Sequence, residues 1–145
     1  MYEQDYIMRQ IKEITAVMAK VLLDAKVDQS FAMLQEVNNQ KAYTLIEKLR
    51  NGEIKEAVEE VDRLTDNNTK ENLMIGLAFY DELSDTSDAA LIAAGYSWVK
   101  AREAFERFAE KYGMQQMTNL YFGDGNDGGD DEQAGAPRQP FFRIP

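Results

Sequence analysis

The side chains of this chain that could bind a metal ion are concentrated near its C-terminus. The stretch 124–132 places acidic and amide side chains among glycines, and the candidate ligands are Asp124, Asn126, Asp127, Asp130 and Asp131. Carboxylate and amide oxygens are the ligands that Ca²⁺ prefers, and glycine permits the sharp turn of a calcium-binding loop. The twelfth position of such a loop needs a bidentate glutamate, but here it is Gly135. The stretch therefore predicts either weak calcium binding or a flexible, solvated linker.

Carboxylate pairs at helical spacing are the other candidates for chemistry. Glu56 can pair with Glu59 or Glu60, and a second group comprises Glu103, Glu106 and Glu110. Such pairs can carry out acid–base chemistry or bind metal, but charges on the outer face of an amphipathic helix are usually only solvated. The chain has no histidine and no cysteine, so its serines lack the usual activating base and thiol chemistry is absent. We expect no enzymatic activity and no cofactor.

The composition predicts one acidic domain. With 145 residues, 44% of them hydrophobic, the chain is long enough to bury a single core. Its formal net charge of -10 should repel the phosphates of nucleic acids, so we expect a basic or neutral protein partner. Charged residues interrupt the apolar N-terminal stretch, which argues against a signal peptide or a membrane-spanning helix there. We therefore expect a cytoplasmic protein that does not bind membranes.

Apolar periodicity predicts an all-α fold. The clearest helix runs to about Leu23 and carries one stripe that must face a core or a partner: Ile7, Ile11, Ile14, Met18 and Val21. Six further helices are predicted around residues 31–37, 43–49, 54–64, 73–83, 89–92 and 98–112. Gly76, inside one of them, predicts close helix packing.

The expected architecture is a single domain of about seven short amphipathic helices in a helical-hairpin arrangement over residues 1–113. Gly52, Gly95 and Gly113 are predicted to end helices, and Ser97 to cap one. Residues 114–145 are predicted to form a tail, with an acidic Gly/Asp-rich linker followed by an apolar Pro/Phe segment.

Four residues are candidates for binding a partner. Phe141, Phe142 and Ile144 form an apolar segment bounded by prolines, with Arg138 and Arg143 beside them. Such a segment suits binding in an extended form to a groove on another protein, on a neighbouring subunit or on its own helices. Trp98, with Tyr43 and Tyr80, is predicted either to line a peptide groove or to belong to the core.

Two resemblances support the helical interpretation. Residues 2–13, the Gly52–Glu53–Ile54 junction and the closing Lys111–Tyr112–Gly113 resemble an uncharacterised family of short helical cytoplasmic proteins from Gram-positive bacteria, for which no activity is established. Residues 52–57 are also similar to the hairpin junction of a tetratricopeptide repeat, although no second copy recurs along the chain. The predicted function is protein–protein interaction or self-association, and the alternative is a calcium-responsive protein using the 124–132 loop.

Overall fold

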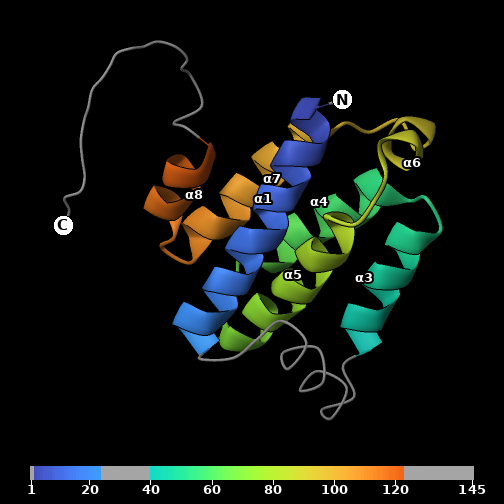
Figure 1. The fold of residues 1–145 in the computed structure, drawn as a ribbon. Helices are drawn as coiled ribbons and strands as arrows, with labels where there is room; N and C mark the ends of the chain where they lie inside the picture. The colour runs from blue at the N-terminus through green and yellow to red at the C-terminus, as the bar shows by residue number, and fades with distance from the viewer. Residues whose placement is uncertain (1, 24–39, 123–145) are drawn as a thin grey trace.

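The computed structural model describes residues 2–23 and 40–122, and every regular element in these ranges is a helix (Figure 1). The elements are α1 (Tyr2–Met18), the π-helical turn η1 (Ala19–Leu23), α3 (Gln40–Arg50), α4 (Ile54–Leu64), α5 (Lys70–Leu83), α6 (Asp88–Ala93), α7 (Trp98–Lys111) and α8 (Gln115–Phe122). The α-helices pack around one hydrophobic core. The predicted all-α single domain is therefore confirmed.

Helix α5 is the central element of the bundle (Figure 1). All of its residues from Asn72 to Tyr80 are buried, as is Leu83. A helix that is apolar on every side has no face to offer to water, so other helices must surround it. It packs against α1, α3 and α4, and its aromatic side chains contact α7. The position of α5 thus sets the positions of the helices around it.

Close contact between α5 and α7 depends on a glycine. A Cβ atom added at Gly76 would lie 2.2 Å from Cε1 of Phe108, far inside van der Waals contact. Beside it, the ring centroid of Tyr80 lies 5.2 Å from those of both Phe105 and Phe108. The close packing predicted from Gly76 is confirmed, because only glycine leaves room for the Phe108 ring.

The ends of the helices follow the local sequence signals. Gly52, Gly95 and Gly113 have φ angles of 87°, 70° and 77°, the left-handed conformation that glycine adopts without steric cost. The Ser97 side chain accepts a hydrogen bond from the backbone N–H of Lys100, which confirms it as the cap of α7. These signals place the start of α7 and the turn that separates α7 from α8.

The apolar stripe of α1 belongs to the core. Ile7, Ile11, Ile14 and Met18 are all buried, whereas Val21 is 60% exposed. Of the two environments predicted for this stripe, a core or a partner, the structure shows the core, because its first four residues are covered. No helix within residues 2–23 and 40–122 combines the length and apolar character needed to cross a membrane.

Two elements differ from the expected order. The helix predicted around residues 31–37 lies outside the described residues. Helix α8 forms within residues 114–145, which the sequence assigned to a tail, so the helical part extends to Phe122. The composition beyond Gly113 suggested a tail, but Met114, Met117 and Phe122 pack against the core. Helices α3 and α4, joined by a turn at Asn51–Glu53, pack against each other.

Candidate functional site

Helix α8 is attached to the bundle along one face. The Gln10 side chain of α1 donates a hydrogen bond of 2.6 Å to the backbone carbonyl of Tyr121. The Phe122 ring lies edge-to-face against Phe105 of α7, with centroids 6.4 Å apart, and the Arg102 guanidinium lies 5.8 Å from the Phe122 ring centroid. These contacts hold α8 between α1 and α7 and leave its outer face open.

An apolar groove lies between α1 and α8. Its cavity volume is about 490 Å³, and it is lined by Val17, Gly113, Met114, Gln116, Met117, Leu120 and Tyr121. Leu120 is 81% exposed, which is a large exposed apolar surface for one side chain. Methionine side chains adapt their shape to different apolar partners, and grouped exposed apolar residues often mark interaction surfaces. The groove can therefore accept an apolar segment of variable shape.

An acidic pocket flanks the other side of α8. Glu103, Glu106 and Glu110 of α7 face Gln115, Thr118 and Asn119 of α8 around a cavity of about 380 Å³ that Arg107 also lines. Glu103 and Glu110 are exposed, whereas Glu106 is partly buried. Burial raises the pKa of Glu106, the positive charge of Arg102 opposes that shift, and the charge of Glu103 adds to it. The predicted solvated face is thus only partly correct, since Glu106 is drawn into a pocket.

The acidic pocket is not arranged as a metal site. Within the two described ranges, no three or more carboxylates come together closely enough to hold a metal ion. Carboxylate and amide oxygens spread around a wider cavity suit a larger organic cation, such as the guanidinium of an arginine. Glu106 is already 3.8 Å from the Arg102 guanidinium, whereas Glu103 and Glu110 are exposed at the pocket.

Other charged clusters are satisfied by internal ion pairs. Lys12 lies in a polar hollow of about 400 Å³ between α1 and the end of α5, where its ammonium is 2.9 Å from Asp81 and 3.2 Å from Asp85. Burial lowers the pKa of Lys12, but the hydrogen bonds and charges of the two aspartates outweigh that effect and raise it overall. Lys111 similarly pairs with Asp62 and Asp66. These lysines link neighbouring segments of the bundle, and their charges are already paired with aspartates.

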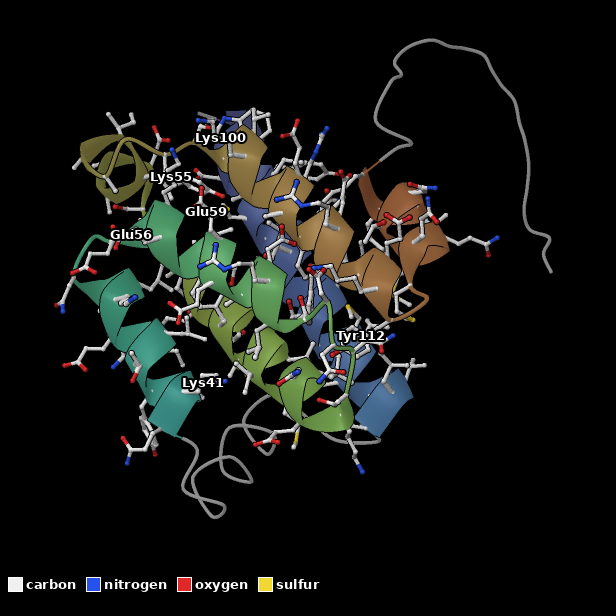
Figure 2. The ribbon with its side chains drawn as sticks, turned by 180° about the vertical axis from the view of Figure 1, so that it is seen from behind. Lys41, Lys55, Glu56, Glu59, Lys100 and Tyr112 are labelled. Carbon is white, nitrogen blue, oxygen red and sulfur yellow. The ribbon has the colours of Figure 1, made fainter. Side chains whose placement is uncertain are left out.

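The carboxylates of α4 lie on its outer face. Figure 2 shows Glu56 and Glu59 on α4, and both side chains are exposed. Glu60 instead accepts a hydrogen bond of 3.0 Å from the Lys48 ammonium on α3. This group is consistent with the predicted solvated face, with one member linking α3 and α4.

The aromatic candidates separate into core and surface. Tyr80 is fully buried and Trp98 is partly buried against the core. Neither is among the residues that line the groove. Tyr43 on α3 is 39% exposed. Trp98 therefore lies away from the candidate groove, and the core interpretation fits Tyr80.

The remaining candidates cannot be compared with the structure. Phe141, Phe142 and Ile144 lie outside the described residues, as do the calcium candidates Asp124, Asn126, Asp127, Asp130 and Asp131. Calcium binding stays a prediction, and a calorimetric titration that released no heat at millimolar Ca²⁺ would contradict it.

The residues that line the groove were missed as site residues by sequence reasoning. Met114, Met117 and Tyr121 follow one another at three- and four-residue steps, the spacing of one helix face. That pattern could have predicted α8. It could not have predicted the groove, because Val17 on α1 supplies its opposite wall.

Comparison with known proteins identifies the family without an activity. No curated protein and no solved structure matches the chain. Residues 1–113, from the start of the chain to the end of α7 and the glycine that closes it, match a family of unknown function (DUF6483). Because this match covers most of its length, the chain belongs to the DUF6483 family.

Proposed function

We propose that this protein is a non-enzymatic interaction module that binds a protein partner in the groove between α1 and α8. The observation that supports the proposal most directly is the exposure of apolar side chains along that groove, led by Leu120 at 81%. Removing such side chains from water would favour association by about 25 cal/mol for each Å² buried. Met114, Met117 and Tyr121 pack partly against the core, so the groove lies directly beside it.

The surroundings of the groove indicate the chemistry of the partner. One side of α8 presents the apolar groove, and the other presents the carboxylates of Glu103, Glu106 and Glu110. A peptide with two or three apolar anchors and a nearby arginine or lysine would use both surfaces. The net charge of -10 favours a basic partner over a nucleic acid and opposes close approach of a second copy.

Several expectations from the sequence belong to this proposal. The protein acts in the cytoplasm as a helical scaffold, and the α3–α4 pair resembles a single tetratricopeptide unit. It performs no reaction, because the chain lacks the histidine and cysteine on which most nucleophilic catalysis depends.

A pair of matched variants tests the groove. Affinity capture from an extract of the native cells compares the intact protein with the variant Met117→Glu, Leu120→Glu. The control variant Ile92→Glu, Val99→Glu places the same two charges at apolar positions that are 66% and 40% exposed on α6 and α7. We expect the first variant alone to lose a captured protein, which mass spectrometry would identify.

Measurement of molecular mass in solution completes this test. Sedimentation of the purified chain determines whether the groove serves a second copy, in which case the Met117→Glu, Leu120→Glu variant converts a dimer into a monomer. A monomeric chain that captures nothing, or that captures the same protein with both variants, would contradict the proposed function.

A further inference from the structure

The groove is formed by the helix from which the C-terminal segment departs. Helix α8 ends at Phe122, and the chain continues from there to Pro145. That continuation ends in Phe141, Phe142 and Ile144, three apolar side chains within four residues. An apolar segment is therefore tethered directly to one wall of an apolar groove.

The tether is long enough to let the segment return to the groove. Residues 123–140 separate Phe122 from Phe141 and are rich in glycine and aspartate. For a random coil of that length the root-mean-square span is roughly 23 Å. Helix α8 is only about 12 Å long at the usual rise per residue. A random-coil tether that short gives an effective concentration on the order of millimolar.

The charges beside the segment match those beside the groove. Arg138 precedes Phe141 by three residues, which in an extended chain corresponds to about 10 Å. That distance is close to the width of one α-helix. A peptide with Phe141 in the groove could therefore cross α8 and place Arg138 near Glu106 and Glu110 on the other side.

We infer that residues 138–145 of the same chain occupy the groove between α1 and α8, with Arg138 beside the glutamates of α7, and so compete with the partner for that groove. The competition rests on the proposed function, whereas the docking itself does not. A competing tail lowers the apparent affinity of the groove for a partner in proportion to the fraction of molecules whose groove is occupied.

Two other occupants are less suited to the groove. Residues 24–39 connect η1 to α3, so neither of their ends is free in the chain. Helix α3 packs against α4 and α5 (Figure 1). A segment from a second copy lacks the advantage of the tether and must approach a molecule of equal negative charge. The NMR experiment with its two controls distinguishes these occupants from the C-terminal segment.

Paramagnetic broadening of methionine methyl signals in NMR tests the docking. Because the chain has no cysteine, the substitution Ala136→Cys gives one attachment point for a nitroxide spin label just before the proposed docking segment. Met114 and Met117 line the groove, so their methyl signals report on what approaches it. We expect both signals to lose intensity strongly.

The matched control is the same labelled chain carrying Phe141→Ser, Phe142→Ser and Ile144→Ser. Its linker and label are unchanged, so any broadening from undirected motion of the tether remains. We expect the Met114 and Met117 signals to recover in this variant and to recover partly in Arg138→Glu. Equal broadening in the intact and triple-serine chains would overturn the inference, including the case in which residues 24–39 fill the groove.

A mixed sample separates the same chain from a second copy. Spin-labelled chains without isotope are combined with methyl-labelled chains that carry no spin label. We expect no broadening in this mixture, and broadening there would overturn docking within one chain in favour of exchange between copies.

The capture experiment separates this inference from the proposed function. With the triple-serine chain we expect partner retention to rise several-fold, because the competing segment no longer holds the groove. If capture depends on Met117 and Leu120 but the NMR signals do not depend on the tail, the proposed function stands and the inference fails. If the tail docks but nothing is captured, the docking stands, whereas the proposed function and the competition built on it fail.

Discussion

Helices α5 and α8 have similar shares of apolar residues but very different environments. Ten residues of α5 are buried, whereas Thr118 is the buried residue of α8. The apolar side chains of α5 complete a core shared with α1, α3, α4 and α7, while those of α8 mostly border a groove. Apolar content alone therefore does not separate a structural helix from a contact surface; the number of neighbouring helices does.

Replacing a leucine by alanine in each of the two helices should give the largest difference in the free energy of unfolding. Leu77 of α5 is fully buried and Leu120 of α8 is 81% exposed. Leu77→Ala should lower the free energy of unfolding by about 2–5 kcal/mol, because it removes buried contacts and leaves a cavity. Leu120→Ala should change it by less than about 0.5 kcal/mol. Urea denaturation followed by circular dichroism measures both, and equal losses would refute the distinction.

Adding one carbon atom at Gly76 should cause the next largest loss of stability. Gly76→Ala places a methyl group against the Phe108 ring and should cost about 1–3 kcal/mol through overpacking. The double variant Gly76→Ala, Phe108→Leu should lose less than the sum of the two single changes, because the smaller side chain removes the clash. Denaturation of all three variants gives the coupling, and strict additivity would show that Gly76 and Phe108 do not restrict each other.

Loss of the Gln10 contact should loosen α8 while sparing α5. Gln10→Ala removes the hydrogen bond to the Tyr121 carbonyl, at a cost of about 1 kcal/mol, and should speed amide hydrogen exchange in α8 alone. Tyr6→Phe is the control, since it removes the hydroxyl that accepts a second hydrogen bond from Gln10 but keeps the link to Tyr121. Faster exchange in α5 as well would show that α8 is part of the central folding unit.

A substitution in the acidic pocket should have the smallest effect on stability. It should stabilise the folded protein, whereas the other substitutions destabilise it. The folded state raises the pKa of Glu106 above its ordinary value of 4.5, so it disfavours the carboxylate and loses stability as the pH rises through the raised pKa. Glu106→Gln should therefore be slightly more stable than the intact protein at neutral pH, and the difference should vanish as the pH falls below 4.5. Because the side chain is partly solvated, the gain should stay within about 0.5 kcal/mol. Thermal unfolding across this pH range measures it, and a less stable variant at neutral pH would contradict the argument.

The sequence predicts those features that depend only on residues close together in the chain. Gly52, Gly95 and Gly113 were recognised as helix ends because the left-handed conformation is a local property of glycine. The apolar stripe through Ile7, Ile11 and Ile14 was recognised because helical periodicity places such residues on one face. Whether that face would meet a core or a partner stayed open, since periodicity does not identify the neighbour.

Packing between distant segments stabilises α8 and creates the site beside it. A helix of eight residues is too short to be stable in water by itself, so its formation depends on docking against α1 and α7 through contacts such as Gln10 to Tyr121. The groove needs Val17 opposite Met117, two residues far apart in the chain, and the acidic pocket needs α7 beside α8. Local sequence determined where helices begin and end in this protein, and packing between distant segments determined which apolar surface remained exposed.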